Sequence, residues 1–526
     1  MGELSRKQFL TGAAMLGVAG AVSAVAPGVA RAEETTWDDE ADVVIVGAGG
    51  GGLAAAVTAA QAVEQDVLVL EVMGSSMQSD SALCNGMIQA ACTRPQENAG
   101  IEDSVDEFDK LLEAVAEGFE VPELRRLFAE NGGATVDWLC DLGVEFGEPS
   151  VFGTAAPYYT DVTPQVARTV TCAGGGVGIT DVLEREAAAA GARFSYNTQA
   201  TRLVTNADGE VVGVKALHDG NEIAIKARKG VVLATGGFTR NKTMVKKFMT
   251  PMLTHMKTDV MTGQNEPVLA SGGSPWQMGD GVRMGMAAGA DLSCTMFPYA
   301  YGVGIRTNRE DNSGALVLTP NFYVNQEGKR FVRENMEPRE NVVTEIWKQS
   351  NGVAFTIFDQ AIVDRNDAIP FATLYHQDFY DAVDNGYLLQ FDTIEELAQT
   401  MGIDADVLVQ TVEEWNACCE VQSDSFGRFE GNATLSTTAP MPVAVPPYYA
   451  AQIGAVCQDT ASGLAINTDF AVLNPMGEVV PRLYAVGNTT GGVKGRINVG
   501  CGQGVGWTIT GGRLVGPIVS ALEPQA

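Results

Sequence analysis

The stretch that decides the fold is residues 42–52, which read DVVIVGAGGGG. Its apolar first half predicts a short β-strand, and the small-residue run LAAAV at residues 53–57 predicts the start of a helix. Gly47, Gly49 and Gly52 have the G-x-G-x-x-G spacing. In order, these glycines permit a tight turn, close approach of a pyrophosphate to the backbone, and close packing of helix on strand. The stretch therefore predicts a phosphate group bound at the positive end of the helix.

A second apolar run, VLVL at residues 67–70, predicts the next strand, and Glu71 follows it directly. Glu71 lies 19 residues beyond Gly52. In dinucleotide-binding folds, an acidic residue about 20 residues after the glycines accepts hydrogen bonds from the ribose. Two strands, a helix and an acid at these spacings predict a Rossmann-like dinucleotide site.

Two further strand–glycine units lie far along the chain. Residues 230–238 read GVVLATGGF, and residues 483–488 read LYAVGN before a glycine-rich segment at residues 491–512. Units this far apart indicate one large cofactor that distant parts of the chain contact together. This arrangement favours FAD over NAD.

With these motifs, the chain resembles a flavoprotein family. That family includes the soluble fumarate reductases, urocanate reductases, bacterial cardiac-glycoside reductases and 3-ketosteroid Δ1-dehydrogenases. The resemblance covers residues 40–523. Its motifs are the glycine loop at 47–52, Glu71, ATGGF at 234–238, GDG at 279–281, VNQEGKRF at 324–331 and YAVGN at 484–488.

The resemblance implies an α/β fold in two parts. A discontinuous Rossmann-like FAD-binding domain would comprise residues 35–294 and 459–526. An α+β cap domain that contacts the substrate would be inserted at residues 295–458. The prolines of residues 441–449 suit an extended return from the cap to the FAD-binding domain.

The resemblance also implies which residues contact FAD. Asn488 stands where fumarate reductases have a glutamate, and it matches the steroid dehydrogenases. The loop at 500–504 is expected to direct backbone N–H groups at the flavin N1/O2 edge. No histidine-containing linking motif follows Gly86, so we expect non-covalent FAD. The expected contacts are Gly47, Ala48, Gly49, Gly52, Glu71, Asp80, Ser81, Gly86, Ala234, Thr235, Gly236, Gly237, Asp280, Asn488, Gly502, Gln503 and Gly504.

For catalysis, the resemblance implies hydride transfer from flavin N5 to an activated C=C bond and protonation by a cap residue. Arg339, nine residues past Arg330, takes the role of the family's proton-donating arginine if one residue is inserted. An arginine needs acids to relay its proton back, and Glu337 and Glu340 are the candidates. The alternative is a surface Arg–Glu cluster on a cap helix.

Tyrosines of the cap are the other candidates for the group that handles the proton. Steroid dehydrogenases have a cap tyrosine near this place, where it acts in the opposite direction of the reaction, the formation of a C=C bond. Tyr299 and Tyr301 are assigned this role, and Phe297 and Tyr323 add to an aromatic set. This set hints at an aromatic or alicyclic substrate. The alternative is that these rings only fill the cap core.

Three carboxylate contacts of the fumarate reductases are replaced here, which argues against fumarate. Their His-His-Thr stretch corresponds to residues 457–463, CQDTASG; Asn498 stands at an arginine position, and Phe297 at a histidine position. Arg496 restores one charge, so a monocarboxylate stays open beside an enone. The second hypothesis is a dehydrogenase that desaturates a ketosteroid-like compound. The third is a flavoprotein that only binds a ligand or passes electrons.

Composition and the N-terminus set the remaining expectations. The chain has 34 basic and 65 acidic residues, a net charge of -31 and three histidines, which argues against nucleic-acid binding and a His-rich metal centre. Residues 1–34 resemble a twin-arginine export signal with Lys7 replacing the second arginine, and Ala30-Arg31-Ala32 is a cleavage site.

From this signal we expect export to the periplasm or the extracytoplasmic face of the cell membrane, and an uncleaved anchor is the alternative. The electron donor is expected to be an external protein, either a cytochrome or a membrane quinol-linked protein. The nine cysteines include no C-x-x-C pair. They favour free thiols over an iron–sulfur cluster.

Overall fold

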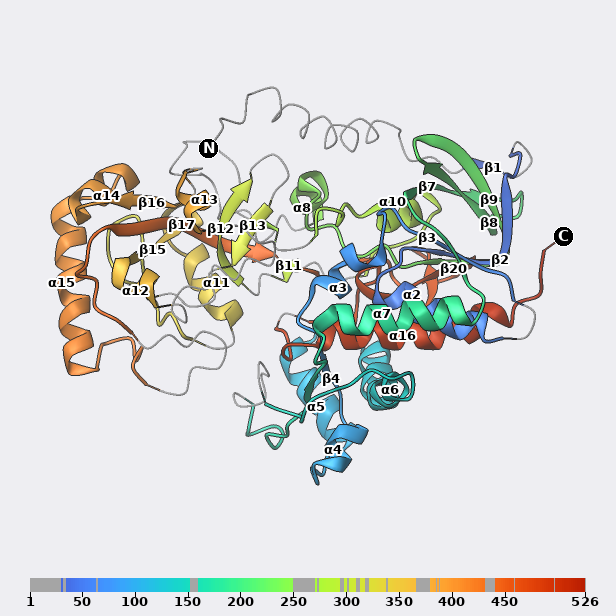
Figure 1. Cartoon of the computed structure of the whole chain (residues 1–526), viewed down its shortest axis with the longest axis horizontal. Coiled ribbons are helices and arrows are strands. Elements are labelled where there is room, and N and C mark those ends of the chain that lie inside the picture. The colour runs from blue at the N-terminus through green and yellow to red at the C-terminus, as the bar shows by residue number, and fades with distance from the viewer. Residues whose placement is uncertain are drawn as a thin grey trace, which may run out of the picture.

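The computed structural model describes residues 30–31, 35–62, 65–151, 159–248, 270–271, 274–293, 298–299, 302–308, 313–316, 321–336, 339–365, 379–384, 386, 388–430, 440–457, 459–495 and 497–525. Two bodies lie side by side along the long axis of the molecule (Figure 1), and each contains its own sheet.

The larger sheet has nine strands in the order β1-β7-β8-β9-β2-β3-β6, with β20 on β9 and β19 on β20. The pairs β2–β3, β2–β9, β3–β6 and β9–β20 are parallel, so these strands end at one edge of the sheet. The strand bounds are β1 (Ala30–Arg31), β2 (Asp39–Val46), β3 (Val67–Leu70), β6 (Arg193–Ser195), β7 (Thr198–Thr205), β8 (Val211–His218), β9 (Asn221–Leu233), β19 (Ala471–Leu473) and β20 (Val479–Ala485).

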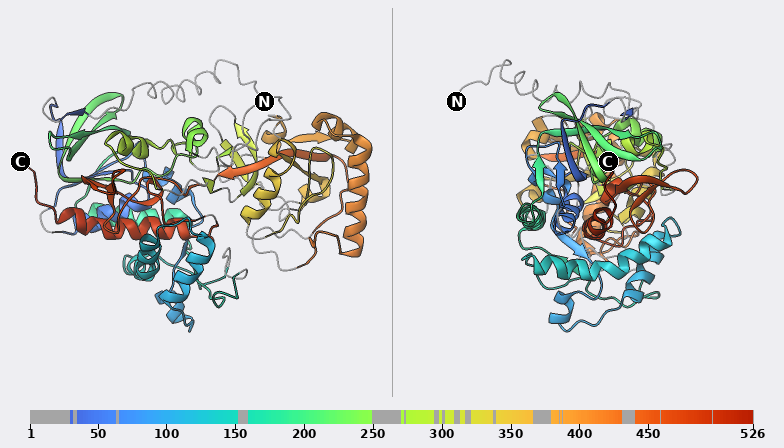
Figure 2. Two further views of the ribbon diagram at one scale, coloured as in Figure 1. Left: turned by 180° about the vertical axis from the view of Figure 1, so that it is seen from behind. Right: turned by 90° about the vertical axis from the view of Figure 1, so that its right-hand side faces the viewer.

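Three helices pack along one face of this sheet, as Figures 1 and 2 show: α2 (Gly50–Ala60), α7 (Gly175–Ala189) and α16 (Gln503–Ser520). The strands are apolar because both of their faces are covered; Val43, Val44 and Ile45 have no exposed surface. Small residues let α2 and α16 approach closely. A Cβ on Gly512 would lie 2.1 Å from the carbonyl oxygen of Gly51.

The second sheet has seven strands in the order β10-β13-β12-β17-β15-β14, with β16 on β17. Helices α11 to α15 lie around it (Figure 1). The bounds are β10 (Ala270–Ser271), β12 (Gly302–Asn308), β13 (Ser313–Leu316), β14 (Phe322–Val324), β15 (Ala354–Asp359), β16 (Leu389–Phe391), β17 (Tyr448–Cys457), α11 (Arg339–Trp347), α12 (Gln360–Asp364), α13 (Phe379–Asp384), α14 (Ile394–Met401) and α15 (Ala405–Val421).

A short antiparallel pair joins the regions around the two sheets. β11 (Pro298–Tyr299) pairs with β18 (Asp459–Thr460), so that Tyr299 lies opposite Asp459. The remaining elements belong to segments that surround the larger sheet. They are β4 (Met87–Gln89), β5 (Thr169–Thr171), α3 (Asp80–Leu83), α4 (Arg94–Asn98), α5 (Val105–Ala116), α6 (Pro122–Asp141), α8 (Lys242–Phe248) and α10 (Asp280–Ala287).

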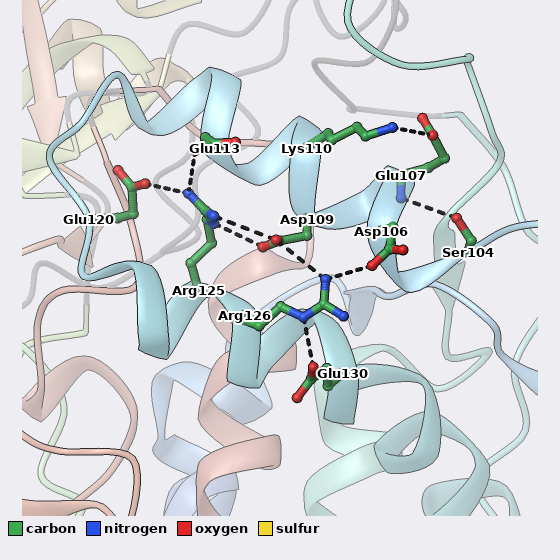
Figure 3. A network of polar contacts seen from close by, with 10 residues as sticks. All are labelled: Ser104, Asp106, Glu107, Asp109, Lys110, Glu113, Glu120, Arg125, Arg126 and Glu130. Atoms are coloured by element: carbon green, nitrogen blue, oxygen red, sulfur yellow. Dashed lines mark hydrogen bonds and ion pairs between the residues drawn. The ribbon is translucent and has the colours of Figure 1, made fainter.

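The α5–α6 hairpin supports the glycine-rich segment before α16. Figure 3 shows Arg125 and Arg126 of α6 facing carboxylates of both helices, including Asp109 at 2.9 Å from Arg125 and Asp106 at 2.7 Å from Arg126. On the inner side, Val121 donates its N–H to the carbonyl of Gly492 at 2.6 Å. The hairpin therefore fixes the backbone that leads to the start of α16.

Arg330, from the VNQEGKRF motif, lies in the core of the second body. Its guanidinium lies 4.7 Å from the ring centroid of Trp415 and bonds Glu334 at 2.9 Å and Asp424 at 2.7 Å. Glu334 and Asp424 are themselves almost fully buried. This part of the motif therefore contributes to the core of the second body.

The α/β class predicted from the sequence is confirmed by the parallel sheet. The domain boundaries stay predictions, and β10, upstream of residue 295, pairs within the second sheet.

Apart from Ala30–Arg31, the predicted export signal lies outside the described residues. Within the described ranges, no helix has the length and apolar character needed to cross a membrane. In the same ranges, no group of three or more His, Cys, Asp and Glu side chains is placed to hold a metal ion.

The contact between α2 and α16 gives a test of the fold. We expect Gly512→Ala to lower the midpoint of thermal unfolding, because its methyl group would meet the Gly51 carbonyl and overpacking costs about 1–3 kcal/mol. Gly74→Ala is the matched control, since the nearest atom to its added Cβ is 3.5 Å away. Equal midpoints for the two variants in differential scanning fluorimetry would contradict the close contact.

Candidate active site

A pocket lies where the parallel strands of the larger sheet end. Open α/β sheets bind their ligands at this edge. The pocket collects residues from the loops after β2, β3, β9 and β20, together with the start of β7 and a segment before α10. Ten of the predicted FAD contacts line it: Gly47, Gly49, Glu71, Asp80, Ser81, Ala234, Thr235, Gly236, Asp280 and Asn488.

The glycine loop between β2 and α2 forms one wall. Gly47 has φ +108°, and a Cβ there would lie 2.4 Å from the carbonyl oxygen of Ala234. Gly52 does not line the pocket; a Cβ there would lie 1.9 Å from the carbonyl oxygen of Gly47, so this glycine seats α2 against the loop. The N-cap residue Gly49 offers no side-chain cap. The first N–H groups of α2 are therefore available to a phosphate.

Glu71 ties this loop to β3. Its Oε2 accepts the N–H of Ala48 at 2.7 Å, and its Oε1 accepts the N–H of Met73 at 2.9 Å. The N–H of Ala48 is thus used within the protein, and Ala48 itself does not line the pocket. Burial raises the pKa of Glu71 above the ordinary value of 4.5.

Asp80 and Ser81 begin the short helix α3 opposite the glycine loop. Asp80 accepts the N–H of Ser274 at 2.7 Å and the side-chain amide of Gln277 at 2.9 Å. Burial, with a smaller contribution from the Asp459 carboxylate, raises the pKa of Asp80. A Cβ on Gly50 would lie 3.1 Å from Ser81 Oγ, so the two walls approach closely here.

The segment after β9 and helix α10 form the next wall. Thr235 Oγ1 accepts the N–H of Gly281 at 3.0 Å. Asp280 accepts the side-chain amide of Gln199 from β7 at 2.8 Å and pairs with Arg283 at 3.2 Å. These bonds hold α10 against β7 and the end of β9.

Asn488 marks the other end of the pocket, and an ion pair lies behind it. Lys494 donates to Asn488 Oδ1 at 3.3 Å and pairs with Asp459. The Lys494 side chain is only 4% exposed. The sequence motifs assigned no role to Lys494 or Asp459. The signal that could have indicated an ion pair is a lysine inside a glycine-rich segment. If such a segment is buried, the charge of the lysine requires a partner.

Five other predicted contacts lie outside the pocket lining. Gly502 begins α16 with φ +100°, and a Cβ there would lie 2.8 Å from the backbone of Ile88 and Gln89; a Cβ on Gly86 would meet Gly175 at 2.4 Å. These glycines therefore permit close backbone contact around the start of α16. The five residues are Gly86, Gly237, Gly502, Gln503 and Gly504.

The catalytic candidates are only partly described. Arg339 is the first residue of α11 and Tyr299 lies in β11, but their side chains fall outside the description. Glu337, Tyr301, Phe297 and Arg496 lie outside the described residues. Tyr323, in β14, is fully buried within the second body, as expected for a core ring.

The residues present fit a long cofactor with phosphate groups. Helix α2 presents uncapped N–H groups to the pocket, and a buried carboxylate lies beside its glycine loop. Near the start of α16, Gln89 is fully buried, and among the described residues neither atom of its side-chain amide has a hydrogen-bond partner. A buried amide without a partner is costly unless a ligand satisfies it. Sequence reasoning missed Gln89, because no motif marks it.

Comparison with known proteins decides the family. Residues 42–505 match the FAD binding domain family. The chain belongs to this family. FAD is therefore its cofactor. The chain is an FAD-dependent oxidoreductase, and its homologues are reductases and dehydrogenases that act on C=C bonds.

Three relatives are reductases or oxidoreductases by name. An NADH:acrylate oxidoreductase of Vibrio harveyi is 31% identical over 74% of this chain and 36% of its own length. A urocanate reductase of Eggerthella lenta is 31% identical over 84% of this chain and 69% of its own length. A digoxin reductase of Eggerthella lenta is 28% identical over 99% of this chain and 98% of its own length. The chain thus spans about a third of the acrylate oxidoreductase.

Two solved structures are similar in fold. The open conformation of a flavocytochrome c3 fumarate reductase has a TM-score of 0.69 and 25% identity, and covers 92% of this chain and 78% of its own. The 3-ketosteroid-Δ4-(5α)-dehydrogenase of Rhodococcus jostii RHA1, in complex with 4-androstene-3,17-dione, has a TM-score of 0.64 and 27% identity. It covers 94% of this chain and 100% of its own. The family resemblance predicted from the sequence is confirmed.

The raised pKa of Glu71 gives a pH prediction. When the pH falls through this pKa, Glu71 is protonated and no longer accepts as a carboxylate, so we expect FAD to be released at a pH above 4.5, the ordinary Glu value. FAD fluorescence in the filtrate of the holoprotein, measured against pH, reports this release. Glu71→Gln should retain FAD more weakly near neutral pH and lose this step. An unchanged profile in the variant would assign the release to another group, such as Asp80.

Proposed function

We propose that the chain is an exported FAD-dependent enzyme that reduces an activated C=C bond in an enone or an α,β-unsaturated acid other than fumarate. The observation that carries the proposal is the junction at the end of the FAD pocket. There, Asn488 of the pocket contacts the Lys494–Asp459 pair, and Asp459 lies opposite Tyr299 of the strand that leads into the cap. A substrate held at this junction has the FAD site on one side and the cap on the other.

Once reduced by the electron donor, bound FAD would supply the hydride to one carbon of the double bond. The chain must then orient the substrate, exclude water and protonate the other carbon. We assign protonation to Arg339 at the start of α11, with Glu337 and Glu340 as relays. Tyr299 and Tyr301 would contact the substrate from the β11 region.

The alternative is an FAD-dependent dehydrogenase that desaturates a ketosteroid-like substrate. Asn488, which matches the steroid dehydrogenases, favours this alternative, and so does the similarity to the Rhodococcus structure. Arg339 favours reduction. The two directions share the same FAD site, and they differ in which partner exchanges electrons with the flavin.

We also propose that an external protein, either a cytochrome or a membrane quinol-linked protein, delivers the electrons. The expected export signal at residues 1–34 supports a location outside the cytoplasm. A net charge of -31 suits a basic partner.

Direct assay of the FAD-loaded chain tests the reaction. With reduced methyl viologen as donor, we expect dye oxidation that depends on an enone or an unsaturated acid, and little with fumarate. Desaturation of a saturated 3-ketosteroid in the presence of an electron acceptor would favour the alternative. Absence of both activities in protein that retains FAD would contradict this proposal.

Arg339 has its own test. Replacing a general acid costs about a hundredfold or more in rate, so Arg339→Gln should lower kcat strongly while KM changes little. Arg333→Gln is the control, because Arg333 bonds Asn335 at 3.0 Å within the same segment. Equal losses in both variants would show a structural effect on the segment, and wild-type turnover of Arg339→Gln would remove Arg339 from the reaction.

A further inference from the structure

A tight turn at residues 274–277, which read SPWQ, contributes to one wall of the FAD pocket. The N–H of Gln277 donates to the carbonyl of Ser274 at 3.2 Å and closes the turn. Pro275 occupies the second position, where its fixed φ favours a β-turn. Trp276 occupies the third position and belongs to the pocket lining. The turn therefore carries a large aromatic residue to the cofactor site.

Asp80 holds both ends of this turn. One oxygen of its carboxylate, Oδ1, accepts the backbone N–H of Ser274 at 2.7 Å, and the other, Oδ2, accepts the side-chain amide of Gln277 at 2.9 Å. The amide oxygen of Gln277 in turn accepts the hydroxyl of Thr239 at 2.7 Å. Ser274 is 3% exposed and Gln277 is 2% exposed. Because buried polar groups are costly to leave unpaired, these bonds fix the position of the turn.

Trp276 differs from the two residues that Asp80 holds. Ser274 and Gln277 are buried, whereas Trp276 between them is only partly buried. Among the described residues, no other aromatic residue lines the pocket. A partly exposed indole leaves apolar ring surface in contact with water until a ligand covers it. Trp276 is therefore available to pack against a planar group of the bound cofactor.

The segment that carries Trp276 is bonded to the ribose end of the pocket. Glu71, the acid expected to bind the ribose, accepts the N–H of Thr198 on its backbone carbonyl at 2.8 Å. The next residue, Gln199, donates its side-chain amide to Asp280 at 2.8 Å. Asp280 lies four residues after Trp276, and Glu71, Gln199 and Asp280 all line the pocket with it. The planar group at this end of FAD is the adenine ring.

We propose that Trp276 stacks on the adenine ring of FAD, and that Asp80 is a positioning residue that acts on FAD through the turn at residues 274–277. Stacking of a base on an aromatic side chain contributes to binding without hydrogen bonds to the base edge. Such a contact matters for retention, since FAD is expected to be bound non-covalently. The inference goes beyond the proposed function, because it concerns how the cofactor is held and is independent of the substrate.

The affinity of the full chain for FAD tests the stacking. In Trp276→Leu, which keeps an apolar side chain without a ring, the dissociation constant of FAD should rise by about tenfold or more, whereas Trp276→Phe should stay within about threefold of the wild type. Ultrafiltration of the FAD-loaded protein and flavin fluorescence of the filtrate give this constant. Trp138→Leu is the matched control, because Trp138 of α6 is also partly buried and lies outside the pocket lining.

An optical signal identifies the adenine ring as the partner. ADP contains adenosine and a pyrophosphate but no flavin, so it changes tryptophan emission through contact and not through energy transfer to a flavin. Added to the full chain after removal of FAD, ADP should change the emission of the wild type and of Trp138→Leu, and leave that of Trp276→Phe unchanged. Calorimetry shows whether ADP is bound. Bound ADP without a change in wild-type emission would overturn the adenine contact.

A double-mutant cycle tests the role of Asp80. Asparagine offers one acceptor oxygen in place of two, so Asp80→Asn breaks one bond to the turn and should weaken FAD binding. If Asp80 acts through Trp276, the double variant Asp80→Asn, Trp276→Leu should bind FAD as weakly as Trp276→Leu alone. Additive losses would overturn the positioning role.

Asp359→Asn is the matched control for this cycle. Asp359 is fully buried and accepts the backbone N–H groups of Ala444 and Val445 at 2.7 and 2.8 Å, and it lies outside the pocket lining. Its dissociation constant for FAD should equal that of the wild type. Should Asp80→Asn fail to fold, Gln277→Leu replaces it in the cycle, because it breaks the bond at the other end of the turn.

The affinity measurements decide the inference whether or not ADP is bound. Equal dissociation constants of FAD for the wild type and Trp276→Leu would overturn the stacking, and so would an equal loss in Trp138→Leu. Absence of turnover with every substrate, in protein that loses FAD only on replacement of Trp276 or Asp80, would contradict the reductase function and leave this inference standing.

Discussion

Direct contact between backbone segments far apart in the sequence is the constraint on which the FAD pocket depends. The Gly47 turn lies against the end of β9, Gly52 lies on the Gly47 carbonyl, and α16 reaches the first turn of α2 through Gly512. None of these approaches leaves room for a side chain. The glycine-loop wall of the pocket is therefore built of backbone, which can bind phosphate groups through N–H donors and gains its rigidity from packing.

Buried charge is used differently in the two bodies. In the second body, Arg330 lies against the rings of Trp415 and Phe426 and pairs with Glu334 and Asp424, so its charge is satisfied within the core. At the end of the pocket, the Lys494–Asp459 pair contacts a pocket residue and the strand leading into the cap. Both pairs satisfy their own charges. The second pair does so between a residue of the pocket lining and the strand that pairs with β11.

The sequence predicted well what local spacing encodes. Gly47, Gly49 and Glu71 follow from a turn, a helix start and an acid after a strand, and the structure places all three at the pocket. Longer-range features had no such signal. Gln199 reaches Asp280 across 81 residues, and Lys494 meets Asp459 only because β18 and the glycine-rich segment pack together in three dimensions. The N–H of Ala48 donates to Glu71, and the contact of Ala48 with FAD stays a prediction.

The order in which the chain is made has a consequence for loading the cofactor. The pocket combines Gly47 from the first strand–helix unit with Asn488 and Thr508 from the last, and the hairpin of α5 and α6 is bonded to Gly492. A ribosome-bound chain lacks the part of this wall that Val486, Gly487, Asn488 and Thr508 form until almost all of the chain has been synthesised. FAD can thus be enclosed only after translation is nearly complete, so transport across a membrane with the cofactor in place would have to follow folding of the whole chain.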